Sequence, residues 1–164
     1  MIERPYREDL DWLRAIAVLS VVFFHWHVPP FRGGYVGVDI FFVISGYLIT
    51  QIIRQDIARN AFSFASFYER RMRRLLPALY AMCLCAIPPA FIYLLPAERA
   101  ELFRSVIATV AFVSNIFFWS QSGYFAAAAE EKPLLHTWSL SVEEQFYLVL
   151  PGLIWLTMQG RPRS

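Results

Sequence analysis

Charged residues are scarce in this chain of 164 residues, and lysine is almost absent. Asp, Glu, Lys and Arg make up 17% of the chain, whereas an average soluble domain contains about 25% of these residues. Lys132 is the single lysine, so nearly all of the positive charge is arginine. Hydrophobic residues instead reach 57%, and the mean hydropathy is +0.43. This composition argues against an ordinary soluble domain and indicates a membrane protein.

Cysteine is rare as well, with only Cys83 and Cys85. Residues two positions apart on a helix point in nearly opposite directions, so we expect no disulfide between them, and two thiols are too few for a zinc site. We interpret both as small packing residues and expect no metal centre. The arginines gather in one compact cluster between long apolar segments, a pattern that argues against nucleic-acid binding.

Long apolar runs are plentiful, and five of them approach the roughly 20 residues that a helix needs to cross a bilayer. Proline inside two of these runs is compatible with a transmembrane helix, because neighbouring groups can satisfy the freed backbone. We therefore predict an all-α fold, a polytopic transmembrane helical bundle with about five spans. The five runs are Leu10–Val28, Val36–Ile53, Leu75–Leu95, Leu102–Trp119 and Val142–Met158.

The arginine content of the loops predicts the orientation in the membrane. Six arginines lie between the second and third runs, which favours a cytoplasmic position for this connection and for the N-terminus. We expect residues 1–9 to form a cytoplasmic segment, residues 10–158 a transmembrane domain that continues beyond this chain, and residues 159–164 a tail. The first run has no small-residue cleavage site, so we expect it to remain as the first anchor of a bacterial inner-membrane protein.

Arg14 and His25 are two ionisable residues inside the first apolar run, eleven positions apart. That spacing is close to three helical turns, so both side chains project from one face, roughly 16 Å apart along the axis. Ionisable groups at membrane depth usually face a bundle interior or a watery cavity. Alternatively, both residues lie near the ends of the run, from which long side chains can reach the headgroups.

Asp39 lies near the outer end of the second run, and the short turn before it predicts an antiparallel hairpin of the first two helices. His25 and Asp39 are then expected at a similar depth. A carboxylate beside an imidazole fixes its tautomer and raises its basicity, as a general base requires. Asp39 can instead stabilise the first turn of its own helix, where acidic residues are favoured.

The segment SFYERRMRRLLP contains four arginines within five positions. Such a cluster can simply hold the topology of a membrane protein. Arginine is also the side chain best suited to phosphate, through paired charge-assisted hydrogen bonds. Arg71 and Arg74 share a helix face and can grip one ligand together, as can Arg70 and Arg73. A cytoplasmic acyl donor that carries several phosphates, such as acyl-CoA, would need such a site.

A second polar cluster, LLHTWSLSVEEQFYLVLP, lies at the entry to the last run. Acidic residues that follow a serine are typical of a helix N-terminus, which is one interpretation of Glu143 and Glu144. However, Glu143 and Tyr147 are one turn apart on one face, and two adjacent glutamates exceed what capping requires. We keep this segment as a candidate site, with His136 and Trp138 as further members.

Four segments, in order along the chain, resemble the acyltransferase-3 family of integral membrane acyltransferases. LDWLRAIAVLSVVFFH resembles the arginine–ten residues–histidine signature of that family, and GGYVGVDIFFVISGYLIT its second-span signature. FYERRMRRLLP resembles its arginine pair, and HTWSLSVEEQFYL its late histidine–tryptophan–glutamate segment. The resemblance runs from Tyr6 to about Leu156. It implies transfer of an acyl group, often acetyl, from a cytoplasmic donor to an acceptor such as O-antigen, exopolysaccharide or peptidoglycan.

The residues and the resemblance together predict a membrane-bound acyltransferase for a carbohydrate or lipid-linked glycan. Acyl-CoA, acetyl-CoA in particular, is the expected co-substrate, and no bound cofactor is expected. The alternatives are a non-catalytic transporter or polysaccharide-export subunit, and an inactive truncated fragment. The predicted catalytic residues are His25, Asp39 and Glu143, the predicted donor-binding residues are Arg14, Arg71 and Arg74, and the other candidates are His136, Trp138, Glu144 and Tyr147.

Overall fold

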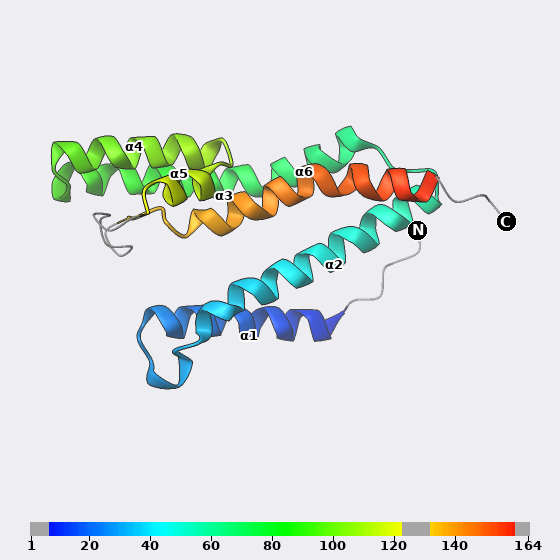
Figure 1. The fold of residues 1–164 in the computed structure, drawn as a ribbon, viewed down its shortest axis with the longest axis horizontal. Helices are drawn as coiled ribbons and strands as arrows, with labels where there is room; N and C mark the ends of the chain where they lie inside the picture. The colour runs from blue at the N-terminus through cyan, green and yellow to red at the C-terminus, as the bar shows by residue number, and fades with distance from the viewer. Residues whose placement is uncertain (1–6, 123–131, 160–164) are drawn as a thin grey trace. The chain divides into compact units, whose positions relative to one another are not determined.

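The computed structural model describes residues 7–122 and 132–159, and the regular structure in these ranges is entirely helical (Figure 1). The predicted all-α fold class is therefore confirmed. Two stretches, Gly34–Ala58 and Phe64–Tyr93, are long and apolar enough to cross a membrane, so the predicted count of about five spans is not confirmed. The elements are α1 Glu8–His25, η1 Pro29–Phe31, η2 Gly34–Val36, α2 Gly37–Ala58, α3 Phe64–Tyr93, α4 Pro96–Val110, α5 Ser114–Ser120 and α6 Thr137–Gln159.

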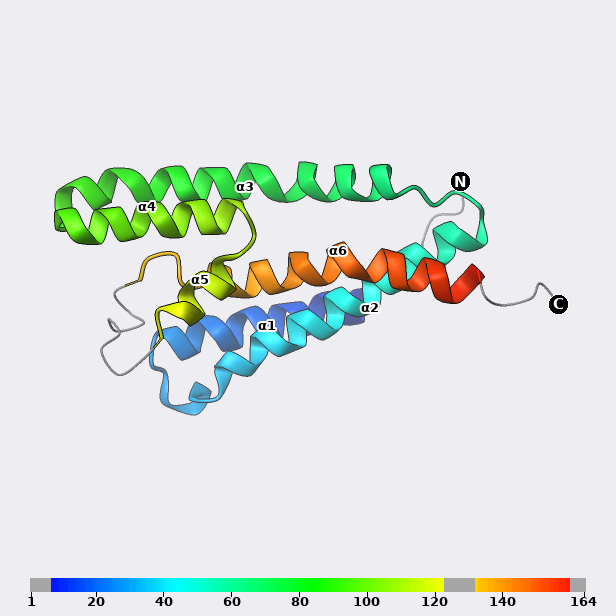
Figure 2. The same ribbon diagram turned by 45° about the horizontal axis from the view of Figure 1, so that its top comes forward.

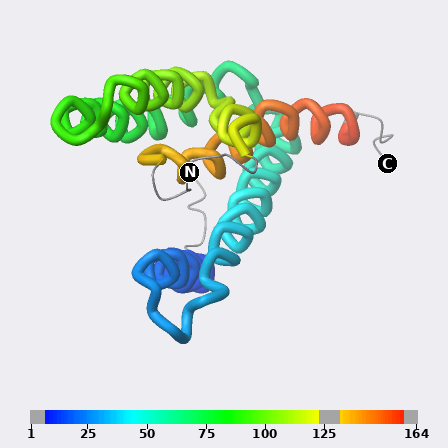
Figure 3. The backbone as a smooth tube through the Cα atoms, turned by 60° about the vertical axis from the view of Figure 1, so that its left-hand side comes forward, coloured from blue at the N-terminus to red at the C-terminus, as the bar shows by residue number. Residues whose placement is uncertain are grey.

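The chain divides into two compact units between Ala58 and Arg59. The first unit is the predicted hairpin, in which α1 packs against η2 and α2. The two long helices meet near the turn and diverge away from it (Figures 1 and 3).

Two glycines allow the close contact in this hairpin. A Cβ atom on Gly34 would lie 2.1 Å from the carbonyl oxygen of Ser20, and one on Gly37 would lie 2.4 Å from the carbonyl oxygen of Ala17. The side chain of Ala17 is completely buried at this contact. The start of α2 can therefore lie directly on the backbone of α1 only because these two positions have no side chain.

The helix α1 ends in a backbone turn centred on His27, which has a left-handed φ of 54°. The N–H of Val28 donates to the carbonyl of Phe23, and the N–H of His27 donates to that of Phe24, both at 3.0 Å. This is the Schellman pattern, in which glycine is the usual residue at the left-handed position. The helix thus ends at His25, three residues before the predicted end.

The second unit is built on α3, whose 30 residues include the arginine cluster. This helix begins at Phe64, eleven residues before the predicted start, because Ser63 caps it by accepting a hydrogen bond from the N–H of Ser66 at 3.5 Å. Figure 2 shows α4 lying along the C-terminal part of α3. Both cysteines are free thiols, with Cys83 buried and Cys85 exposed. The core of the unit is formed by apolar residues from α3, α4, α5 and the segment before α6: Ala90, Leu102, Phe118 and Leu134.

The predicted fourth span, Leu102–Trp119, is wrong as a single helix, because the chain breaks between α4 and α5. Phe112 adopts a left-handed φ of 55°, and a second Schellman turn forms around it. The break frees backbone groups that a continuous helix would pair. The side-chain amide of Gln145 donates to the carbonyl of Phe112 at 2.9 Å and satisfies one of them.

The helix α6 begins at Thr137, five residues before the predicted start, and contains Pro151. Proline has no N–H to donate, and its ring crowds the preceding helical turn, so carbonyl groups in that turn lose their usual partners. The hydroxyl of Tyr68 on α3 donates to the carbonyl of Leu148 in this turn at 2.9 Å. This bond links the two helices next to the predicted polar cluster.

Candidate functional site

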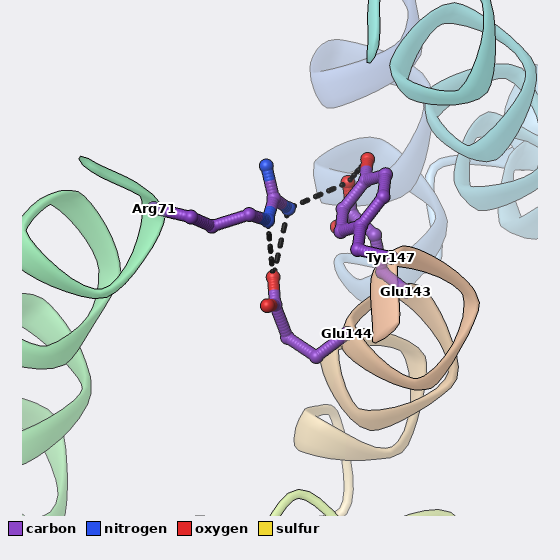
Figure 4. A network of polar contacts seen from close by, with 4 residues as sticks. All are labelled: Arg71, Glu143, Glu144 and Tyr147. Carbon is purple, nitrogen blue, oxygen red and sulfur yellow. Dashed lines mark hydrogen bonds and ion pairs between the residues drawn. The ribbon is translucent and has the colours of Figure 1, made fainter. Parts of the chain in front are cut away.

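An ion pair between α3 and α6 forms the centre of the polar site in the second unit (Figure 4). The guanidinium of Arg71 donates to Oε1 of Glu144 through Nε at 2.8 Å and through Nη2 at 2.7 Å. The same Nη2 lies 3.5 Å from Oε1 of Glu143. Arg71, which the sequence predicts to be a phosphate ligand, is therefore held by the two glutamates of the later motif.

Tyr147 completes this cluster. Its ring lies under the guanidinium, with Cζ of Arg71 3.6 Å from the ring centroid, a distance at which a cation and an aromatic face attract each other. Its hydroxyl donates to Oε1 of Glu143 at 2.5 Å, so the predicted position of these two residues on one helix face is confirmed. The Tyr147 ring is buried. Together with the hydrogen bonds to Glu144, it fixes the position and the orientation of the Arg71 guanidinium.

Burial and charge are unevenly distributed within the cluster. The side chain of Glu144 is 6% exposed, that of Arg71 17% and that of Glu143 23%. One guanidinium therefore faces two carboxylates, and the more accessible carboxylate is the one with the longer contact. Arg71 and Glu144 form a part-buried pair, and removing one partner would leave the other charge without its compensating partner.

The other arginines of α3 have different surroundings. Arg73 pairs with Glu69 at 2.7 Å, but both side chains are mostly exposed, and exposed pairs contribute little stability. Arg74 is exposed and forms no ion pair with any residue that the structure describes. The predicted pair of Arg71 and Arg74 is thus divided between a buried cluster and an exposed position.

His25 ends α1 in the first unit, and its Nδ1 lies 2.8 Å from the carbonyl oxygen of Val21. A carbonyl can only accept a hydrogen bond, so Nδ1 carries a proton, and in the neutral imidazole Nε2 is then the nitrogen with the lone pair. Within the described part of this unit, no ion pair joins His25 to Asp39, which lies in the first turn of α2. The expectation that Asp39 fixes the tautomer is therefore corrected: the preceding turn of α1 does so.

Arg14 lies on α1, where Nη1 is 3.5 Å from Oδ1 of Asp11, one turn away. Both side chains are partly exposed, at 38% and 44%. At the start of the same helix, Arg7 donates to Asp9 through Nε at 2.8 Å and Nη2 at 2.6 Å. These hydrogen bonds lower the pKa of the Asp9 carboxyl to about 2. Acidic residues here also suit the positive end of the α1 dipole.

His136 and Trp138 flank the start of α6, before the Arg71 cluster. His136 Nε2 lies 3.1 Å from Sδ of Met82 on α3, and Trp138 is 40% exposed. Seven positions separate His136 from Glu143, which is about two helical turns. In residues 7–122 and 132–159, no group of three or more His, Cys, Asp or Glu side chains is arranged to hold a metal ion.

A network of uncharged polar side chains joins α4, α5 and α6, and the sequence analysis missed it. Four buried hydroxyl groups form a chain in which Thr109 contacts Thr137 at 3.0 Å, Thr137 donates to Ser114 at 3.0 Å, and Ser114 contacts Ser141 at 2.7 Å. Asn115 and Gln145 exchange two amide hydrogen bonds beside it. The signal was present, since residues 137, 141 and 145 recur every fourth position and share one face of α6.

Comparison with known proteins identifies the family. The chain matches the acyltransferase-3 family, described as an acyltransferase domain, over residues 7–164. The chain belongs to the acyltransferase-3 family. No protein of known structure matches it significantly.

Relatives in the acyltransferase-3 family carry names that specify the chemistry. The O-acetyltransferase OatA of Staphylococcus aureus (strain NCTC 8325 / PS 47) is 39% identical over 167 residues, which cover 100% of this chain and 27% of that protein. The peptidoglycan O-acetyltransferase OatA of Listeria monocytogenes (strain EGD-e) is 39% identical over 98% of this chain and 26% of that protein. The putative peptidoglycan O-acetyltransferase YrhL of Bacillus subtilis (strain 168) is 40% identical over 93% of this chain and 24% of that protein. The chain thus spans about a quarter of the length of the relatives it matches.

Proposed function

We propose that this acyltransferase-3 chain is part of a membrane-bound enzyme that moves an acetyl group from acetyl-CoA to a hydroxyl group of a cell-envelope carbohydrate. Family membership supports the reaction class, and the names of three relatives support acetyl as the group and, for two of them, peptidoglycan as the acceptor. The observation that carries the chemistry is the imidazole of His25, which is exposed and held through Nδ1, so that in its neutral form Nε2 is the nitrogen with the free lone pair.

The proposed step begins at Nε2 of His25. As the acceptor oxygen attacks the thioester carbonyl carbon, Nε2 takes the hydroxyl proton. A carbon–oxygen bond forms, the carbon–sulfur bond breaks, and the departing thiolate recovers the proton from the imidazolium. In the alternative order, Nε2 first attacks the thioester carbon, the carbon–sulfur bond breaks and the thiolate leaves; the acceptor oxygen then takes the acetyl group as the bond to Nε2 breaks, and the hydroxyl proton passes to the thiolate. Both orders require the unprotonated nitrogen that the Val21 carbonyl leaves available.

The donor is proposed to bind from the cytoplasmic side through arginine. The diphosphate and the ribose phosphate of acetyl-CoA need charged donors, and Arg74 is an exposed arginine of the cluster on α3. Arg14, on the same helix as His25, is proposed to attract the donor toward the imidazole. We also propose a position in the bacterial inner membrane with the N-terminus in the cytoplasm: the two apolar helices support a membrane position, and the distribution of arginine is the ground for the orientation.

The test follows labelled acetate into surface glycan in cells that express the intact gene, this segment alone, or the intact gene with His25→Ala. We expect the intact gene to incorporate acetate and the His25→Ala variant to lose incorporation while still inserting in the membrane. His27→Ala is the matched control, since it removes an imidazole two positions away. Normal acetylation by His25→Ala would show that the assignment of His25 is wrong. A segment that transports glycan but never acetylates it would favour the transporter instead.

A further inference from the structure

The guanidinium of Arg71 has little capacity left for a second anion. Nε and Nη2 already donate to Glu144, Nη2 also faces Glu143, and the ring of Tyr147 covers one face of the group. Only 17% of the side chain is exposed. A phosphate that binds arginine in the usual paired geometry needs one free edge with two N–H groups directed at it. The edge formed by Nε and Nη2 is occupied, and on the edge formed by Nη1 and Nη2 only Nη1 is without a contact among the described residues.

The charges around Arg71 also oppose phosphate. When ionised, the cluster carries one positive and two negative charges, so a phosphate brought to the guanidinium meets two carboxylates within a few ångströms. Like charges at that distance repel, and burial strengthens the repulsion because the medium screens less. Arg74, one turn further along α3, is exposed and lacks a carboxylate partner in the described ranges. The two arginines of the motif therefore suit different tasks.

Glu143 is the group that this arrangement leaves available. One carboxylate oxygen is held from two sides, by the Tyr147 hydroxyl at 2.5 Å and by Nη2 of Arg71 at 3.5 Å. Its other oxygen is bound by none of the residues that the structure describes. Glu144, by contrast, is only 6% exposed, and its Oε1 accepts both hydrogen bonds from Nε and Nη2 of Arg71. Glu144 thus fixes the arginine, and the arginine fixes Glu143.

We propose that Arg71 and Glu144 are positioning residues that hold the carboxylate of Glu143 for the acyl-transfer reaction, and that Arg71 does not bind the phosphates of the donor. This role rests on the proposed function, because it concerns the acetyl transfer described above. It divides the arginine motif of the sequence: Arg74 belongs to the donor site, and Arg71 belongs to the glutamate site.

The experiment compares Arg71→Met, Glu144→Gln and the double variant in the intact protein, purified in detergent. Equilibrium binding of acetyl-CoA gives the Kd, and transfer of labelled acetyl to peptidoglycan fragments gives kcat and KM. We expect Arg71→Met to lower kcat on the order of 100-fold, as for other misplaced reacting groups, and to leave the Kd for acetyl-CoA within about twofold of wild type. The double variant should be no slower than Arg71→Met alone, because residues that act as one unit do not add.

Controls separate this role from a merely structural one. Arg74→Met is expected to weaken acetyl-CoA binding roughly tenfold with little change in kcat, the opposite division. Arg71→Lys retains a positively charged hydrogen-bond donor and should recover part of the kcat that Arg71→Met loses. If Arg71→Met does not fold, the same measurements on Arg71→Lys and Glu144→Gln replace it. Two results with an active wild type would overturn the positioning role. In the first, the Arg71 variants bind acetyl-CoA tenfold more weakly at unchanged kcat. In the second, Glu144→Gln binds acetyl-CoA more tightly at unchanged kcat. A wild type that neither binds acetyl-CoA nor transfers acetyl overturns the proposed function and this role with it.

Discussion

Replacing Gly37 by alanine tests the contact between α1 and α2, since helix propensity and sterics predict opposite results. Alanine favours helix over glycine by up to about 1 kcal/mol. The added Cβ, however, would lie 2.4 Å from the carbonyl oxygen of Ala17 and 2.8 Å from Cγ2 of Val21. A backbone carbonyl cannot rotate away, so the helices must separate, and overpacking of this kind costs about 1–3 kcal/mol. Because the obstacle is backbone, we expect sterics to win and a net loss of about 2 kcal/mol.

The measurement is the free energy of unfolding of the detergent-solubilised protein, obtained from titration with SDS and followed by tryptophan fluorescence. Gly33→Ala is the matched control, because a Cβ there would meet nothing within 4 Å. That variant should remain within about 0.5 kcal/mol of wild type, as most surface substitutions do. If Gly37→Ala proves as stable as Gly33→Ala, the close packing of α2 on the backbone of α1 is wrong.

Three further outcomes are expected. His27→Gly should raise the unfolding free energy by about 1 kcal/mol, because glycine adopts the left-handed φ of 54° without the cost that a side chain brings, and the same SDS titration measures it. Thr137→Val should lower it by about 1–3 kcal/mol, since it leaves buried hydroxyl groups without a partner, whereas exposed Thr157→Val should change it little. The Asp9 carboxyl, hydrogen-bonded by Arg7, should titrate with a pKa of about 2 in carbon NMR, and Arg7→Ala should return that pKa to near the ordinary value of 3.8. The Arg7–Asp9 pair therefore stabilises the protein fully above pH 3.8, and this stabilisation is lost as the pH falls toward 2.

The helical fold is predictable from the sequence because long apolar runs with polar ends leave few other options in a membrane. The start of α3 is harder to predict from the sequence, because the arginine-rich segment resembles a loop unless Ser63 is recognised as a helix cap. The break at Phe112 could not be foreseen. No glycine or proline marks it, and the amide that satisfies its carbonyl comes from Gln145, 33 residues further along the chain.

The candidate site shows the same division between local and distant contacts. The spacing of Glu143 and Tyr147 predicts that they are neighbours on one helix face, and the structure shows that a hydrogen bond joins them. The partner of Arg71 is 73 residues away, and only packing of α3 against α6 reveals it. For His25 the sequence suggested a distant partner, the carboxylate of Asp39, whereas the structure shows a local one, the backbone carbonyl of Val21 on the same helix.

The two polar clusters of the second unit differ in a way that bears on function. The hydroxyl groups of Thr109, Ser114, Thr137 and Ser141 are neutral, buried and mutually bonded, so they hold α4, α5 and α6 together and offer nothing to a substrate. The cluster around Arg71 carries an excess carboxylate, and a charge of this kind in an apolar protein is costly unless function requires it. If both clusters were only structural, Thr137→Val and Glu143→Gln would lose activity in step with stability. A site at Glu143 instead requires that Glu143→Gln lose acetyl transfer while its unfolding free energy stays close to that of wild type.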